Sequence, residues 1–338
     1  MLRRNESNGT RSGTKIRHAL IERADMTVTS IPALEHQIRD FINGARKQHP
    51  LLKDSRAWNQ LCSSLDVVGD TELAFDAYEV APETDDPGAV YILVYGVLQA
   101  LVLQQDAVMH LAEALGLKYE LAPPLREVRA IRNASIGHPT KRLGQPRSHF
   151  ISRISMRKAG FQLMTVYPDH GPAEFKGVSL PALISMQRCQ LRAVLEEVVD
   201  SLKHEEAEHK AMFKDDTLAS AFPPTTDYYF EKIFESISSG GSPEYGRMHV
   251  QLLIEAVARF QSKLAERGVA GAYDSVEYHL DLVGYPLQEL DRYFANPGVS
   301  RLNERHAVIF TQFAQGEIQT LRQMAAEIDE SYQGEQDA

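Results

Sequence analysis

The chain has 338 residues, of which 43% are hydrophobic and 24% are charged, and its formal net charge is −10. This length predicts one large domain or two of modest size, and the acidic balance excludes a general nucleic-acid coat protein. The only cysteines are Cys62 and Cys189. Two thiols exclude a disulfide framework and favour a reducing, cytoplasmic location.

The first 28 residues differ in composition from the rest of the chain. They are rich in Ser, Asn, Gly, Thr and Arg and poor in apolar side chains, so we predict a disordered N-terminal tail over residues 1–28. No apolar segment follows the arginines, and we do not expect a secretory signal here. Met26 opens a more protein-like segment, and translation from either Met1 or Met26 fits the pattern.

Helical patterns follow the tail. Ser30 can cap a helix that has Pro32 in its first turn. The longest apolar run of the chain lies in a helix near residues 88–115. Because Tyr95 and Gln99 interrupt this run, we expect a core helix and no membrane span. The helices predicted in this part of the chain cover about residues 30–46, 55–78, 88–115 and 125–135.

The pattern changes after residue 135, where Gly137 and Pro139 end the last of these helices. Stretches of β-favouring residues between turns then predict a small antiparallel β insertion near residues 150–178. Helical patterns return at about residues 180–213, 228–236, 245–267, 275–293 and 300–332. The predicted fold class is therefore mainly α. A helical bundle over residues 29–215 carries the β insertion, and a C-terminal helical domain covers residues 216–338.

Positive charge gathers in one window of this acidic chain. Residues 126–158 hold nine basic side chains and one acidic one, Glu127, which gives the window a charge of +8 and leaves −18 for the rest. Phosphate contacts depend on local potential, so the window predicts a specific site for a polyanion such as RNA. The alternative is a solvated basic surface.

One motif inside this window can carry chemistry. An arginine followed by four to six residues and a histidine occurs about two or three times by chance in a chain of this composition. It occurs here as Arg11/His18, Arg132/His138, Arg142/His149 and Arg301/His306. The spacing alone therefore decides nothing. Only Arg132/His138 lies at the end of an apolar helix, inside the basic window, with Asn133 directly after the arginine.

At these residues the chain resembles the HEPN superfamily. Residues 58–71 (WNQLCSSLDVVGDT) and 98–107 (LQALVLQQDA) also look like bacterial members with this motif, and the resemblance covers about residues 55–213. It implies an all-α bundle with the activity of a metal-independent endoribonuclease that needs no cofactor. Such domains occur in bacterial toxins, anti-phage abortive-infection proteins and RNA-targeting CRISPR effectors. The resemblance therefore implies tRNA or mRNA as substrate, and an antitoxin or a phage trigger as a further partner.

The proposed chemistry assigns a role to each catalytic candidate. RNA carries its own nucleophile, the 2′-hydroxyl, so the enzyme need only move protons and stabilise an anionic phosphorus. Histidine side chains ordinarily titrate near neutrality, so His138 can exchange a proton with the 2′-oxygen or the leaving 5′-oxygen. Arg132 offers a permanent charge to phosphate oxygens, and Asn133 can hydrogen-bond phosphate or fix His138. The alternative is that both residues have structural roles: His138 would cap the helix end, and Arg132 would form a surface salt bridge.

Further residues are expected to assist. The substrate-binding candidates are basic side chains of the window: Arg126, Arg129, Lys141 and Arg142. Asp66 and Asp70 lie on one helical face and could orient Arg129 or Arg132, or else belong to a solvated helix. The polar run Gln104, Gln105 and Asp106 faces either the site, with Gln105 in a supporting role, or a dimer seam, or forms a buried hydrogen-bond network.

The spacing of the motif poses a geometric problem. Six residues of a regular helix turn through about 600°, which would leave Arg132 and His138 about 120° apart. The break at Gly137 can redirect His138. HEPN nucleases also commonly pair two motifs across a dimer, so the resemblance implies a homodimer with a composite active site.

Two other function classes stay open. The domain can be a catalytically inactive HEPN-type scaffold that binds RNA, a nucleotide or a protein, or the chain can be a structural helical adaptor. A metal site is not expected, because His204 and His209 are five residues apart and diverge on a helix, unlike metalloprotease histidines.

Overall fold

We describe a computed structural model of the chain, over residues 29–137, 147–167, 171–238, 241–296 and 298–333. These residues form two compact units. Of the described residues, the first unit contains those from 29 to 39 and from 59 to 199, and the second contains those from 40 to 58 and from 200 to 333. One boundary between the units, at residues 199 and 200, falls inside the helix Leu180–Phe213. The sequence analysis had placed the boundary between the domains at residue 215. The predicted tail, residues 1–28, lies outside the described residues.

The mainly α fold class is confirmed, since 76% of the structure is helical and one small antiparallel sheet is present. In chain order, the helices before the sheet are α2 (Ile31–Asn43), α3 (Ala45–Lys53), α4 (Ser55–Val80), α5 (Pro87–Ala114) and α6 (Pro123–Arg132). The helix predicted at 30–46 is in fact two helices, because the chain leaves helical geometry at Gly44, where the backbone is extended. After the sheet comes α7 (Leu180–Phe213), at its predicted bounds.

The core of the first unit lies against α5. Leu98 of α5 and Phe75 of α4 are completely buried, and Ile184 of α7 is nearly so. Apolar burial on this scale is the main favourable term in folding. By length and composition alone α5 could also cross a membrane, but many of its side chains are buried in this core, as in the central helix of a globular protein.

A polar chain crosses this apolar core. Gln104, Gln105 and Gln187 are fully buried. The Gln187 amide donates to Gln104 Oε1 (2.9 Å) and accepts from Gln105 Nε2 (2.7 Å), and Gln104 Nε2 donates to Glu72 Oε1 (2.7 Å). At the other end Gln105 Oε1 accepts from Arg129 Nε (2.8 Å). Of the alternatives for this polar run, the structure shows the buried network, which fixes the register of α4, α5, α6 and α7.

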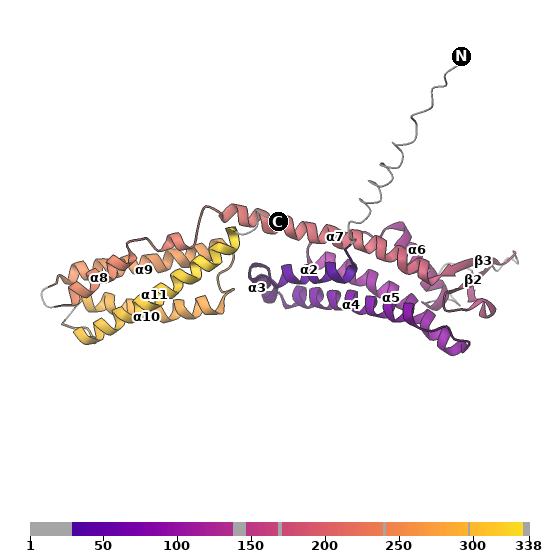
Figure 1. Ribbon diagram of the computed structural model, residues 1–338, viewed down its shortest axis with the longest axis horizontal. Helices are drawn as coiled ribbons and strands as arrows, with labels where there is room; N and C mark the ends of the chain where they lie inside the picture. The colour runs from indigo at the N-terminus through magenta and orange to yellow at the C-terminus, as the bar shows by residue number, and fades with distance from the viewer. Residues whose placement is uncertain (1–28, 138–146, 168–170, 239–240, 297, 334–338) are drawn as a thin grey trace, which may run out of the picture. The chain divides into compact units, whose positions relative to one another are not determined.

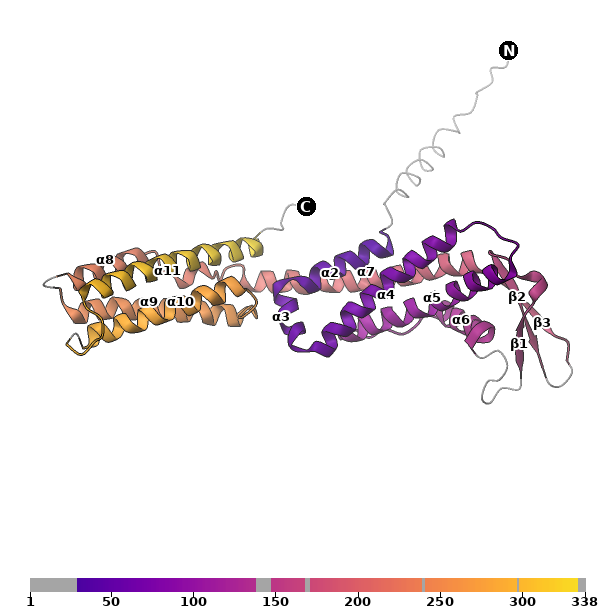
Figure 2. The ribbon, with the colours of Figure 1, turned by 90° about the horizontal axis from the view of Figure 1, so that it is seen from below.

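Three antiparallel strands form the β insertion: β1 (Ser148–Ile151), β2 (Gly160–Val166) and β3 (Glu174–Ser179), in the order β1-β2-β3. One face of the sheet is buried through Phe161, Leu163 and Val178, which join the core of the first unit. A short 3-10 turn (Arg153–Ser155) follows β1. Figure 2 shows α6 along α5 and the strands beside it.

The second unit contains a four-helix bundle, α8 (Thr226–Ile237), α9 (Pro243–Glu266), α10 (Asp274–Ala295) and α11 (Glu304–Gln333), preceded by a 3-10 turn (Ala219–Ala221). Each helix packs on the next, and α11 closes the ring against α8 (Figure 1). The core is rich in aromatic side chains such as Phe230 and Phe260. The C-terminal helical region is therefore observed as predicted.

A buried ion pair stabilises the second unit. Arg267, at the C-terminal end of α9, is 1% exposed, and its Nη2 lies 2.9 Å from Asp329 Oδ1 on α11. Asp329 also accepts the backbone N–H groups of Leu218 and Ala219, both at 2.9 Å. The Arg267 guanidinium lies 4.5 Å from the centre of the Tyr332 ring. These contacts join α9, α11 and the segment before α8.

Candidate functional site

The motif lies at a change of helix type. Helix α6 ends at Arg132, and residues Asn133–Gly137 form a π-helix, η2. The sequence predicted a regular helix to residue 135, so its last turn was wrong. Single π-helical turns are rare in proteins and are frequent at functional sites. The predicted 120° offset assumed regular α-helical geometry, which these residues do not have. His138 itself lies outside the described residues, as do Lys141 and Arg142.

The Arg132 guanidinium is held by neutral groups. Gln99 Oε1 on α5 accepts hydrogen bonds from Arg132 Nη2 (2.6 Å) and Nε (3.2 Å), and Asn133 Oδ1 accepts from Nη1 (3.0 Å). Within the part of the chain that the structure describes, no carboxylate forms an ion pair with Arg132. The side chain is half-buried and fixed in direction, while its charge is not neutralised by these partners. Such a group is suited to a phosphate.

Glycine at position 137 allows this arrangement. A Cβ atom there would lie 2.9 Å from Arg132 Nη1 and 3.1 Å from Asn133 Oδ1. Both distances are shorter than an ordinary van der Waals contact, so any larger residue would displace the guanidinium. Gly137 was expected only to end a helix. Its closeness to Arg132 adds a second reason for glycine, one that sequence reasoning missed.

A buried hydroxyl lies in the same π-helix. Ser135 is 5% exposed, and its Oγ has no hydrogen-bond partner among the described residues. A buried polar atom without a partner costs free energy, so its presence in a fold requires a structural or functional explanation. The sequence analysis gave Ser135 no role.

Arg129 differs from Arg132 although it lies one turn earlier. Its Nε donates to Gln105 and its Nη2 forms an ion pair with Asp106. The charge of Arg129 is thus balanced, and its side chain anchors α6 to the buried network. Arg126, another turn earlier, is exposed to solvent. Of the described candidates for substrate binding, Arg126 is free to move toward a ligand and Arg129 is held.

The two supporting aspartates do not have the predicted contacts. Asp66 Oδ1 accepts a hydrogen bond from Arg39 Nη2 at 2.7 Å and is largely exposed. Asp70 is also exposed on α4. Neither carboxylate contacts Arg129 or Arg132 in the described structure, so the solvated-helix alternative holds. The face of α4 that meets α5 carries Glu72 instead, which the periodicity of the sequence did not distinguish.

The basic window is less uniformly available than its total charge indicates. Lys158 Nζ donates to the backbone carbonyls of Glu79 (3.2 Å) and Ala81. The Arg147 guanidinium lies 6.0 Å from the centre of the Tyr167 ring. The one acidic residue of the window, Glu127, pairs with Lys176 of β3. The charge of Lys158 is therefore structural and Glu127 is neutralised, whereas Arg147 remains exposed.

An apolar surface lies beside Arg132 on α5. Ile92, Tyr95 and Leu103 are 75%, 41% and 44% exposed, and Gly96 is also exposed. Their spacing of three to four residues places them with Gln99 on one side of the helix. Gln99 therefore lies within this α5 face and also holds Arg132. Sequence reasoning noted Gln99 only as an interruption of an apolar run, and that interruption was the available signal.

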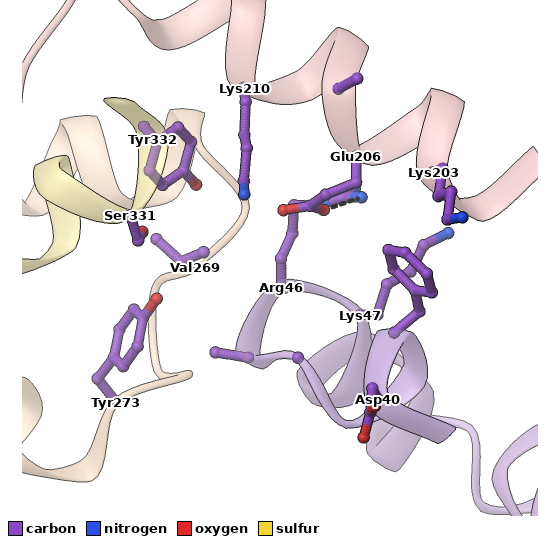
Figure 3. Close-up of a pocket in the computed structure, with 14 residues that line it drawn as sticks. Asp40, Arg46, Lys47, Lys203, Glu206, Lys210, Val269, Tyr273, Ser331 and Tyr332 are labelled. Carbon is purple, nitrogen blue, oxygen red and sulfur yellow. Dashed lines mark hydrogen bonds and ion pairs between the residues drawn. The ribbon is translucent and has the colours of Figure 1, made fainter. Parts of the chain in front are cut away.

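The second unit contains a cavity of about 730 Å³. Its lining comes from α3, from the end of α7, from the segment that precedes α10, and from α11 itself. Figure 3 shows the salt bridge on its wall, in which Glu206 Oε2 lies 2.9 Å from Arg46 Nη2. Lys210 and the Tyr273 and Tyr332 hydroxyls border the same space. Burial raises the pKa of both tyrosines above the ordinary value. Sequence reasoning did not find this cavity.

The two histidines considered as metal ligands have other contacts. His204 Nε2 lies 3.1 Å from Glu208 Oε1, and His209 Nε2 lies 3.0 Å from the carbonyl of Arg267, to which it can donate. Burial lowers the pKa of His209, with a further contribution from Arg46. Within the described ranges, no group of three or more His, Cys, Asp or Glu residues is placed to hold a metal.

Comparison with known proteins found no matching family model, no similar curated protein and no similar solved structure.

Proposed function

We propose that the chain is a metal-independent endoribonuclease of HEPN type. One observation supports this most strongly. The motif arginine, Arg132, is fixed by two neutral amide oxygens at a π-helical turn, with its charge available for a phosphate. A structural arginine is normally balanced by a carboxylate, as Arg129 is by Asp106. The basic window and the helical bundle add to the resemblance.

In the proposed reaction the 2′-hydroxyl of RNA attacks the adjacent phosphorus, and the bond to the 5′-oxygen breaks. The 2′-hydroxyl loses its proton and the leaving 5′-oxygen gains one; His138 carries out one of these two transfers and solvent water the other. Arg132 stabilises the negative charge that develops on the phosphate oxygens, and Asn133 keeps the guanidinium in place. The products carry a 2′,3′-cyclic phosphate end and a 5′-hydroxyl, and hydrolysis of the cyclic ester by water converts the first into a 3′-phosphate end. DNA lacks the nucleophile and is not cleaved.

The proposal includes a homodimer with a composite active site. The α5 face, defined by Ile92, Tyr95, Gly96 and Leu103, supports it, because exposed apolar patches of this kind often mark protein interfaces. Gln99 lies in this face, so a second copy docked there would approach Arg132. An Ile92→Asp substitution should then convert a dimer into a monomer in analytical ultracentrifugation. An unchanged mass would remove α5 from the interface.

The biological role that fits this activity is a cytoplasmic toxin or an anti-phage effector. Cleavage of host tRNA or mRNA would arrest growth. An antitoxin or a phage trigger would then control the enzyme. These roles depend on the proposed activity, so a chain that does not cleave RNA would not have them.

A nuclease assay on total RNA in EDTA tests the proposal. Wild type should release fragments with cyclic phosphate ends, and both Arg132→Ala and His138→Ala should not. Equal cleavage by all three proteins, or an absolute need for a metal, would contradict it. Tight RNA binding without cleavage, unchanged by His138→Ala, would favour the inactive HEPN-type scaffold. Absence of salt-sensitive RNA binding would favour a structural adaptor.

A further inference from the structure

The exposed face of the β insertion has an unusual composition. In an antiparallel sheet with one buried face, the other face is normally polar. Here Phe161, Leu163 and Val178 point into the core, yet the opposite face carries Phe150, which is 47% exposed, and Phe175, which is 59% exposed. Packing in the described structure does not account for two exposed phenylalanines on so small a sheet. Such residues are candidates for contact with a ligand.

The register of the strands places these rings in one row. Phe150 of β1 lies opposite Met164 of β2, and Met164 lies opposite Phe175 of β3. Neighbouring strands are about 4.8 Å apart, so the two rings are about 10 Å apart across Met164. Each ring can therefore accept a separate planar group. We call these three residues the aromatic row.

Among the described residues, the space around the aromatic row is open. On the same face, Gly177 is the second residue after Phe175, and a Cβ built on it would have no described atom within 4 Å. Ser148 and Gln162, also on this face, are small or polar. Flat, unobstructed access next to an aromatic ring is what base stacking requires, and every base has a π-face.

The position and charge of the sheet indicate which planar group would bind. Strand β1 contacts the π-helix that follows Arg132. Arg147, directly before β1, and Arg153, in the 3-10 turn two residues after the end of β1, are exposed. A cationic rim beside aromatic rings suits a chain that carries both phosphates and unpaired bases. Base pairs in a duplex offer no free face to such rings, except at their ends.

We propose that the aromatic row binds the unpaired bases of single-stranded RNA and presents the strand to Arg132. This inference rests on the proposed function and specifies its substrate class. Phe150 and Phe175 each stack on one base, while the flanking arginines contact the backbone. The preferred cleavage sites are then loops and single-stranded regions. The cleavage chemistry itself does not need the row.

The test measures binding separately from cleavage. A fluorescent single-stranded oligonucleotide with 2′-O-methyl groups has no nucleophile, so its anisotropy reports binding to the full chain without reaction. Wild type should bind it at least tenfold more tightly than the same sequence in a duplex. Phe150→Ala and Phe175→Ala should each weaken binding by about tenfold, as expected for the loss of one stacked base. Phe175→Trp keeps an aromatic ring at this position and should therefore bind the oligonucleotide about as tightly as wild type.

A matched control excludes a general effect of losing an exposed phenylalanine. Phe313 of α11 is 42% exposed and lies in the second unit. Phe313→Ala should bind the probe like wild type. Binding by Phe150→Ala and Phe175→Ala that equals wild type, equal affinity for single strand and duplex, or no binding by wild type would each overturn the proposal.

Cleavage of unmodified RNA, measured in parallel, separates this proposal from the proposed function. Arg132→Ala should lose cleavage, yet adding Phe175→Ala to it should still weaken binding of the probe by about tenfold, because the aromatic row binds bases independently of Arg132. If wild type binds the probe through the aromatic row but never cleaves RNA, the binding role of the row is supported and the nuclease assignment is contradicted. If wild type cleaves and the phenylalanine variants bind and cleave equally well, the nuclease stands and the row has no such role.

Discussion

Arg132 and Arg267 both lie at the C-terminal end of a helix, one in each unit, and their partners are opposite in kind. Arg267 is 1% exposed, pairs with the carboxylate of Asp329 and lies over the Tyr332 ring. Arg132 is half-buried and bonds only to amide oxygens in the described structure. Position on the helix therefore does not reveal the role of an arginine. The chemistry of its partners does, because a compensated charge stabilises the fold and an uncompensated one is available to a ligand.

The largest effect is expected from breaking the compensated pair. Arg267→Met would leave Asp329 as a buried charge without its cation, so we predict a loss of about 3–5 kcal/mol of unfolding free energy. Urea denaturation measures it. Adding Asp329→Asn removes the stranded charge and should recover part of the loss. A decrease below about 1 kcal/mol for Arg267→Met would mean that this pair is not structural.

The buried network provides the next prediction. Gln187 bonds to Leu101, Gln104 and Gln105 in the core. Gln187→Leu leaves several of these groups without partners, and we expect about 2–4 kcal/mol of destabilisation. Gln190→Leu, on the same helix but outside the network, is the control and should change stability by about 0.5 kcal/mol or less. Equal effects of the two substitutions would show that the network contributes little.

Gly137→Ala tests how closely Arg132 must be held. The added methyl group would lie 2.9 Å from Arg132 Nη1, and displacing this flexible side chain is cheap for the fold. We therefore expect cleavage to fall by about tenfold, since misplaced charge stabilises the transition state less well, with stability changed by less than about 1 kcal/mol. Gly69→Ala is the control, because nothing lies within 4 Å of its Cβ. Full activity of Gly137→Ala would show that the close contact is unimportant.

The smallest effect concerns pH and the surroundings of Arg267. The fold lowers the pKa of His209 from its ordinary value of 6.5, because burial disfavours the imidazolium and Arg46 repels it. In addition, His209 Nδ1 is buried and has no hydrogen-bond partner among the residues that the structure describes. The unfolded chain binds the proton more readily, so the associated stability is present above pH 6.5 and is lost as the pH falls below that value.

Urea denaturation of wild type between pH 7.5 and 5.5 should show this decline. His209→Gln should have a shallower dependence, and His204→Gln, with its exposed ring on the same helix, should follow wild type. Identical slopes for all three proteins would refute the assignment to His209.

Periodicity and helix-stop signals in the sequence predicted most of the fold. Helix α7 has its predicted bounds, and the three strands lie where β-favouring stretches were recognised. The break at Gly44 and the π-helix after Arg132 were missed, because they depend on local backbone geometry that residue patterns do not encode.

The site was predicted less completely than the fold. Arg132 and Asn133 are adjacent in sequence, and the structure brings them together. Gln99 is 33 residues away, and only the packing of α6 on α5 decides that it, and not Asp66, meets Arg132. A helical pattern shows which residues share a face, but it does not show which face of a second helix they meet. The exposed aromatic row likewise depends on strand register.

The most direct test of the contrast between Arg132 and Arg267 measures two properties of one variant, its RNA cleavage and its stability. Arg132→Ala and wild type are compared in the single-turnover rate of RNA cleavage and in urea denaturation. We predict that cleavage falls by about 10²–10³-fold, as for the loss of a group that stabilises transition-state charge, while the unfolding free energy changes by about 1 kcal/mol or less. Unchanged cleavage together with a loss of several kcal/mol of stability would contradict the account, because Arg132 would then be a structural arginine like Arg267.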